Sequence, residues 1–128
     1  MNSIITHGIE IAVSTNYYAA QSDPKSGHYF FIYEIQISNK SEFTVQLLKR
    51  HWDITDALGR KRMVDGDGVV GETPVIEPGD TYTYNSGCDF ETEIGKMSGH
   101  YSMKRIVDEA EFNVLIPEFR MVLPAKLN

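Results

Sequence analysis

Residues 29–38 are the segment that most constrains the fold. On one side of this segment every second residue is large and apolar or aromatic, and on the other side the residues change from apolar to polar. A period of two residues places each set on one face of an extended strand. The β-branched and aromatic residues that dominate the segment also favour a pleated backbone. The pattern predicts a long strand, with these residues on its apolar side: Tyr29, Phe31, Tyr33, Ile35 and Ile37.

The rest of the chain repeats this pattern in shorter segments and lacks helix signals. No stretch of eleven or more residues combines a 3.6-residue period with capping residues, and Gly95 and Gly99 interrupt the nearest candidate, residues 92–104. Turn residues such as Pro24 and Gly27 separate the apolar segments. Further strands are predicted at residues 9–14, 45–54, 60–64, 81–84, 97–103, 112–116 and 119–123.

About eight short strands separated by turns predict an all-β fold with very little helix. We expect an antiparallel β-sandwich like that of immunoglobulin and fibronectin type III domains, with Trp52 in the core. A length of 128 residues suits one packed core, so residues 1–128 are expected to form a single domain.

Three local features refine this prediction. The apolar phase changes at Leu47 and Leu48, so a β-bulge is needed there to keep Trp52 inside. The charged segment from Arg60 to Val64 is typical of an edge strand. Residues 66–79, which contain glycines and prolines, are expected to form a loop.

Charge and cysteine content narrow the function classes. A net charge of -6 and a pI near 5.1 argue against nucleic-acid binding by bulk electrostatics. The sequence contains no run of 18 apolar residues and no signal-peptide pattern, so we expect no membrane association. The single cysteine, Cys88, forms no internal disulfide and gives no zinc site, which favours a cytoplasmic location.

Charged residues are unevenly distributed. Five of the twelve basic residues fall within fourteen positions: Lys49, Arg50, Arg60, Lys61 and Arg62. This basic island is either a solvated face or an anion site. A later acidic patch consists of Asp89, Glu91 and Glu93. It would hold a hard cation loosely or act as a charged edge that discourages aggregation.

Gly66, Gly68 and Gly71 have the G-x-G-x-x-G spacing of a dinucleotide-binding motif. In that motif the last glycine opens a helix whose N-terminus binds the pyrophosphate. Pro74 follows closely and prevents such a helix, so a structural role in a turn is favoured. Backbone amides in a glycine-rich turn also form anion-binding nests. In that alternative, the residues that supply the positive charge are Arg60, Lys61 and Arg62.

Catalytic and metal-ligating patterns are weak. The histidines His7, His28, His51 and His100 show no H-x-x-x-H or H-x-H spacing, so no metal site and no cofactor are predicted. Ser86 and Cys88 supply nucleophilic atoms, but no pattern assigns a histidine partner to them. The sequence therefore predicts no catalytic residues and a protein that is not an enzyme.

Six ordered motifs together resemble the ApaG family, also called CorD. They cover nearly the whole chain and lie at residues 45–56, 66–74, 76–79, 84–87, 95–103 and 116–119. The resemblance implies a bacterial, cytosolic protein with a fibronectin type III-like sandwich. It also implies a link to dinucleoside polyphosphate metabolism and to cobalt and magnesium homeostasis. The family brings no established catalytic residues, and a pyrophosphate role for its glycine motif is only a suggestion.

These observations favour a non-enzymatic module that binds a protein partner. The alternative is a nucleotide- or pyrophosphate-binding protein, or a hydrolase, that uses Gly66–Gly71 with the neighbouring arginines and lysine. Cation sensing through the acidic patch is a third hypothesis. The sequence does not identify the partner and leaves a homodimer open.

Overall fold

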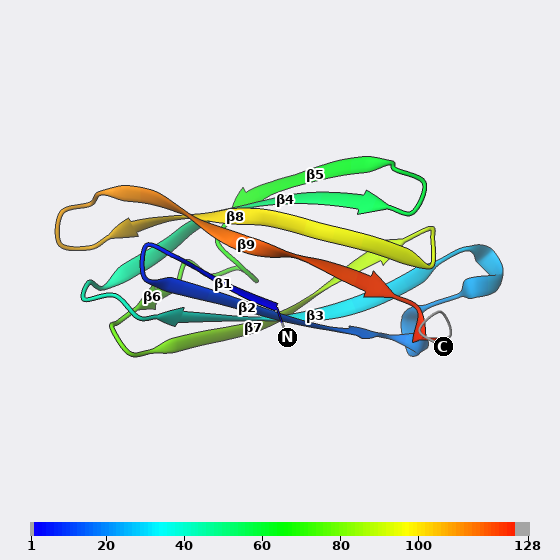
Figure 1. Cartoon of the computed structure of the whole chain (residues 1–128), viewed down its shortest axis with the longest axis horizontal. Helices are drawn as coiled ribbons and strands as arrows, with labels where there is room; N and C mark the ends of the chain where they lie inside the picture. The colour runs from blue at the N-terminus through cyan, green and yellow to red at the C-terminus, as the bar shows by residue number, and fades with distance from the viewer. Residues whose placement is uncertain (1, 125–128) are drawn as a thin grey trace.

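The chain folds into two antiparallel β-sheets that pack face to face, as the computed structural model in Figure 1 shows for residues 2–124. One sheet has four strands in the order β1-β2-β3-β7, and the other has five, with β5-β4-β8-β9 in sequence and β6 beside β4. The strands of the four-stranded sheet are β1 Asn2–Thr6, β2 Ile9–Tyr17, β3 Tyr29–Asn39 and β7 Thr81–Phe90. Those of the five-stranded sheet are β4 Val45–Asp56, β5 Lys61–Asp67, β6 Val75–Ile76, β8 Ile94–Arg105 and β9 Glu111–Val122.

The predicted all-β sandwich with very little helix is confirmed. In residues 2–124 the helical segments are two 3₁₀ turns, η1 Ala19–Gln21 and η2 Pro24–Ser26. Neither turn is long or apolar enough to span a membrane. In β3 every second residue from Tyr29 to Asn39 is buried, as the sequence period requires. Burial of both inner sheet faces supplies the main stabilising free energy of such a fold.

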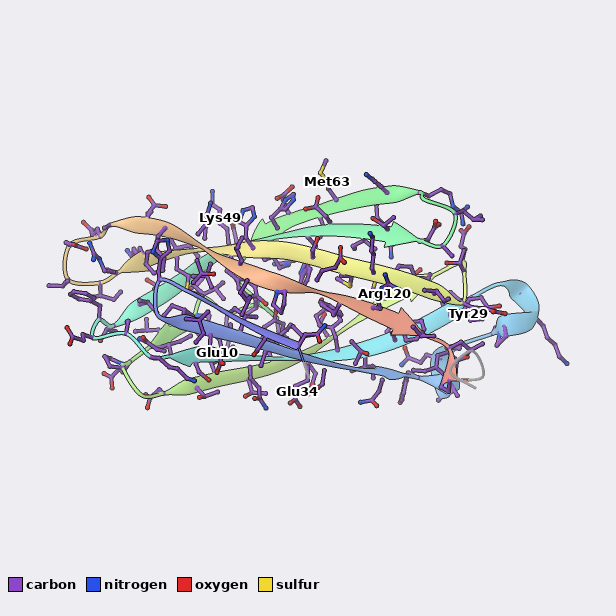
Figure 2. The ribbon with its side chains drawn as sticks, viewed as in Figure 1. Glu10, Tyr29, Glu34, Lys49, Met63 and Arg120 are labelled. Carbon is purple, nitrogen blue, oxygen red and sulfur yellow. The ribbon has the colours of Figure 1, made fainter. Side chains whose placement is uncertain are left out.

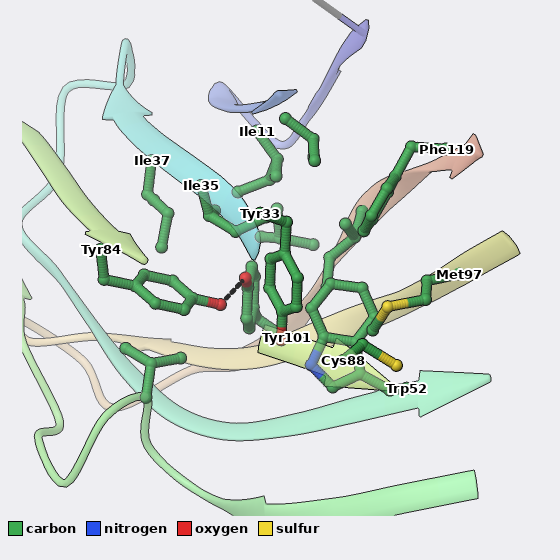
Figure 3. Packing of buried hydrophobic residues seen from close by; sticks show 14 of the residues in the cluster. Ile11, Tyr33, Ile35, Ile37, Trp52, Tyr84, Cys88, Met97, Tyr101 and Phe119 are labelled. Carbon is green, nitrogen blue, oxygen red and sulfur yellow. Dashed lines mark hydrogen bonds between the residues drawn. The ribbon is translucent and has the colours of Figure 1, made fainter. Parts of the chain in front are cut away.

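Trp52 lies in the core, as predicted, with 3% of its surface exposed. Its ring contacts Tyr33 and Phe119 edge-on, with centroids 5.4 and 5.9 Å away. Figure 3 shows these rings with Met97 and Cys88 between the two sheets. The aromatic cluster therefore joins strands from both sheets.

The predicted bulge is also confirmed, because the register between β4 and β8 shifts between Leu47 and Lys49. The shift moves Arg50, Trp52 and Ile54 onto the inner face, in phase opposite to Val45 and Leu47. An arginine thereby enters the space between the sheets.

Two expectations about strand limits are wrong, and one strand was not expected. Residues 112–122, expected as parts of two strands, belong to one strand, β9, because a second register shift opposite Met97 and Gly99 accommodates Pro117 in this edge strand. Gly66 and Asp67 belong to β5, and β6 lies inside the segment expected to be loop. Strand β1 was not predicted, since it buries no side chain and so carries no period-two signal.

Candidate functional site

The glycine motif forms the end of β5 and a tight hairpin. Gly66 pairs with Arg50 in the β4–β5 ladder, and the Gly68 N–H donates to the Leu48 carbonyl at 2.8 Å. Val69 and Glu72 exchange two backbone hydrogen bonds, of 2.8 and 3.0 Å. Val70 and Gly71 between them have φ of 48° and 78°, as a type I′ turn requires. The amides of Gly68, Val69 and Glu72 are therefore used by the fold.

Gly68 is the motif position with the strictest steric requirement. Its φ is 61°, and a Cβ atom there would lie 2.1 Å from the Glu72 carbonyl oxygen. At Gly66 a Cβ would lie 2.7 Å from the Arg50 guanidinium, whereas at Gly71 it would enter open space. The spacing of the triplet thus follows from a strand, a close backbone approach and a turn, each at one glycine.

The predicted basic residues Arg60, Lys61 and Arg62 line a cavity of about 220 Å³ where β5 begins. Arg60 donates to the Asp56 carboxylate at 2.6 Å and to that of Glu91 at 3.2 Å. Arg62 lies 3.5 Å from the Asp89 carboxylate and also donates to the Asp89 carbonyl. The structure thus brings Arg60 and Arg62 together with Glu91 and Asp89 of the acidic patch, and their charges offset each other.

Cys88 lies beside this cavity, with its Sγ atom 3.2 Å from the Arg62 guanidinium. Burial raises the pKa of the Cys88 thiol, and the nearby Arg62 only partly opposes this effect. The thiol is therefore protonated at neutral pH and is a poor nucleophile.

The basic segment 60–62 and the glycine hairpin are not brought together. They lie at opposite ends of β5, and six residues of extended chain between Arg62 and Gly68 span about 20 Å. The cation next to the hairpin is Arg50, whose Nη1 atom donates to the carbonyls of Asp67 and Gly68 at 3.0 Å each.

Arg50 also lines a pocket of about 240 Å³ between the sheets. The other lining residues are Tyr33, Trp52, Val69, Val70, Gly71, Tyr84, Asn85 and Ser86. By sequence alone, Arg50 belongs to the basic island and is not assigned to the glycine motif. The phase change at Leu48 was the available signal, because it predicts that Arg50 faces the same way as Trp52.

Two buried tyrosines lie next to this pocket. The Tyr84 and Tyr101 hydroxyls are hydrogen-bonded to each other inside the sandwich, as Figure 3 shows. Burial raises the pKa of both phenols and also that of Tyr33. These hydroxyls therefore stay neutral at physiological pH, where they can donate hydrogen bonds but cannot act as strong bases.

The outer face of the five-stranded sheet carries a histidine cluster that the sequence spacing did not reveal. His51 lies opposite His100 on β8 and Asp65 on β5. Its Nδ1 atom lies 2.7 Å from Asp65 and its Nε2 atom 3.1 Å from Asp53, while the two imidazoles stack 5.1 Å apart. Among residues 2–124, no group of three or more histidine, cysteine or acidic side chains is arranged to hold a metal ion.

We predict that replacing Asp65 with Asn lowers the pKa of His51. The hydrogen bond to Asp65 is the main cause that raises this pKa, desolvation opposes it, and Asp53 adds to it. Because the folded pKa is raised, the stabilisation is full below the unfolded value of about 6.5 and is lost as pH rises through the folded pKa. An NMR titration of the imidazole protons measures the shift. An unchanged His51 midpoint in Asp65→Asn would contradict the assignment.

The remaining feature is the free edge of β5. Within residues 2–124 this strand pairs only with β4, and its residues are mostly exposed. Met63 has 70% of its surface exposed and Val64 has 38%. Figure 2 shows Met63 projecting outward on the same side as Lys49.

The fold and these surfaces define a small antiparallel β-sandwich protein whose glycine motif builds a hairpin. The family follows from comparison with known proteins. Residues 19–105 match the family model described as DUF525, the ApaG domain. The chain therefore belongs to the ApaG family, as the sequence motifs suggested.

Individual relatives support this assignment. The chain is 47% identical to Protein ApaG of Brucella canis, over 97% of this chain and 95% of that protein. Protein ApaG of Sinorhizobium fredii gives the same identity and coverage. The crystal structure of the putative ApaA protein from Bordetella pertussis superposes with a TM-score of 0.88 at 39% identity, covering 91% of this chain and 94% of that one.

Proposed function

We propose that this protein is a non-enzymatic protein-interaction module that binds an extended polypeptide segment along the free edge of β5. The main observation that supports this proposal is that the edge strand β5 directs unpaired backbone groups outward. Addition of a strand to such an edge is a common mode of peptide recognition.

The hydrogen bonds at both ends of the β4–β5 ladder indicate which backbone groups are available. The Asp56 N–H donates to the Arg60 carbonyl at 3.0 Å, and the Gly68 N–H donates to the Leu48 carbonyl at 2.8 Å. Directly opposed, bonded pairs alternate with non-bonded pairs in an antiparallel ladder. Even-numbered residues of β5 therefore bond to β4. The N–H and C=O groups that face the free edge are those of Lys61, Met63 and Asp65, whereas the Asp67 carbonyl already accepts a hydrogen bond from Arg50.

Contacts at the other sheet edges favour β5 as the edge that binds a polypeptide. Strand β9 packs against β1 and β2 of the opposite sheet. On β7, Arg62 donates to the Asp89 carbonyl, and the Tyr82 hydroxyl donates to the Glu72 carboxylate of the glycine hairpin. Side chains thus cover parts of that edge. Strand β5 combines exposed backbone groups with the exposed side chains of Met63 and Val64.

We predict that Met63→Pro abolishes partner binding but leaves the fold intact. The Met63 N–H faces the free edge, so proline removes a donor for an added strand and no bond to β4. Met63→Leu is the matched control and is expected to bind normally. Val64→Pro, which loses a bond to β4, should instead reduce stability.

The partner is detected with a photocrosslinking residue at position 63, expressed in the native host. The control position is Leu115, an exposed apolar residue on the outer face of β9. A specific adduct at 63 that is absent at 115, and that competition with Met63→Pro protein does not reduce, supports the proposal. Equal adducts at both positions would overturn it.

One observation favours a second candidate, a pyrophosphate- or nucleotide-binding protein. The Arg50 guanidinium and the Gly71 backbone line the same pocket, and arginine and exposed amides are common anion ligands. Titration with pyrophosphate would then shift the Val70 and Gly71 amide resonances, and Arg50→Met would remove the shift. Absence of any shift at millimolar pyrophosphate would exclude this candidate.

A further inference from the structure

The charge pattern of β5 identifies the polypeptide that fits its edge. The strand begins with Lys61 and Arg62 and ends with Asp65 and Asp67. Parallel pairing of two such strands places like charges together, whereas antiparallel pairing places each basic end beside an acidic end. Charged edges usually prevent association between sheets. Here the change of sign along the strand removes that protection for one arrangement, a second copy running antiparallel.

The faces of the sheet restrict the register. In a continuous sheet the outward residues of one strand must lie opposite outward residues of the next. The outward residues of β5 are odd-numbered, because Met63 and Asp65 pair with Asp53 and His51 on the outer face. Pairing centred on Met63 then places Lys61 opposite Asp65 twice and Met63 opposite its copy. Pairing centred on Val64 also places Lys61 opposite an acidic residue, Asp67, but it places the apolar Met63 opposite the charged Asp65.

The backbone is compatible with this arrangement. The groups of Lys61, Met63 and Asp65 face the free edge, and in the register centred on Met63 these are the residues that exchange hydrogen bonds across the twofold axis. Backbone pairing therefore allows this register, and the side chains select it.

We propose that the β5 edge binds β5 of a second copy of this chain, antiparallel and centred on Met63. The two five-stranded sheets then form one continuous, symmetric sheet of ten strands. This inference rests on the proposed use of the β5 edge for protein binding. A contact confined to one short strand buries less than the roughly 1,200 Å² typical of stable complexes, so the dimer is weak.

Sedimentation equilibrium between about 10 μM and 1 mM tests the dimer, since weak contacts have dissociation constants in or near this range. The wild-type protein is expected to change from monomer to dimer mass. Lys61→Asp or Asp65→Lys alone replaces two attractive cross-strand pairs with two repulsive ones and should weaken association about tenfold or more. The combined variant Lys61→Asp/Asp65→Lys restores opposite charges and should recover most of the association.

Cysteine crosslinking tests the register. Directly opposed residues in a bonded antiparallel pair have Cα atoms about 5.5 Å apart, within the range of a disulfide. Met63→Cys is therefore expected to form a disulfide-linked dimer on mild oxidation, and Val64→Cys is not. The native Cys88 is buried and serves as the unreactive background. Crosslinking of Val64→Cys in place of Met63→Cys would overturn the register.

Self-association and binding of another polypeptide at the β5 edge are distinguished by combining these measurements. A protein that stays monomeric at about 1 mM, while the specific adduct at position 63 still forms and competition with Met63→Pro protein does not reduce it, would overturn the second-copy inference but not the proposed function. If Met63→Pro does not weaken association, and the Met63→Pro protein competes for the adduct as well as the wild-type protein does, both are overturned. Recovery by the charge-swapped double variant distinguishes a specific pair from loss of folding, because a misfolded single variant would not be rescued.

Discussion

Gly68→Ala is expected to lower the free energy of unfolding by about 3 kcal/mol or more, a large share of the stability of a domain of this size. An L-residue with a φ of 61° costs about 1–2 kcal/mol, and the added Cβ would lie 2.1 Å from the Glu72 carbonyl oxygen. Because that atom belongs to the backbone of the hairpin, the hairpin itself must move. Urea unfolding followed by circular dichroism measures the loss.

Gly71→Ala is the matched control, because it changes a glycine of the same motif with a similar φ of 78° but with open space around the new Cβ. We expect a loss of about 1 kcal/mol from backbone strain alone. Equal losses at Gly68 and Gly71 would show that the close approach to Glu72 does not constrain the hairpin. If the motif served mainly to bind a nucleotide, Gly68→Ala would instead reduce affinity and leave stability nearly unchanged.

Trp52→Ala is expected to destabilise the protein by about 3–5 kcal/mol. The side chain is 3% exposed and contacts Tyr33 across the sandwich as well as Phe119 on β9. Its removal leaves a cavity between the sheets and breaks edge-on aromatic contacts. Because Trp52 is the only tryptophan, unfolding is followed by circular dichroism rather than by its fluorescence.

Leu115→Ala is the control for this change. Leu115 is a large apolar residue of the same sheet, but it lies on the outer face with 49% of its surface exposed. Its truncation should alter stability by about 0.5 kcal/mol or less. A similar loss for both variants would mean that apolar area in general, and not the packed core around Trp52, determines the stability of this sheet.

Most of the sandwich could be predicted because its strands bury one face. In β3 the side chains of Phe31, Ile35 and Ile37 are almost fully buried, and their alternation is visible in the sequence. The bulge at Leu47 was predictable for the same reason, since burial continued in the opposite phase. Strand β1 escaped prediction because β1 is held by backbone pairing with β2 and buries none of its side chains.

The candidate sites were less predictable, because they depend on which strands are neighbours. Arg60, Lys61 and Arg62 are close to the glycine motif in sequence, yet an extended strand separates them from the hairpin. Arg62 instead reaches Asp89 on the opposite sheet. Likewise, His51 and His100 are far apart in sequence and stack only because β4 pairs with β8.

The sequence by itself determined the secondary structure class, the sandwich and the family, because hydrophobic periodicity and ordered motifs are local properties of the chain. The tertiary structure alone decided what the charged residues do. Electrostatic interactions act through space, so Arg62 meets its counter-charge Asp89 on the opposite sheet, and Arg50 becomes the cation beside Gly66–Gly71. The tertiary structure also places β5 at a sheet edge. There the charge pattern of the strand, which is visible in the sequence, becomes the surface that we propose binds another chain.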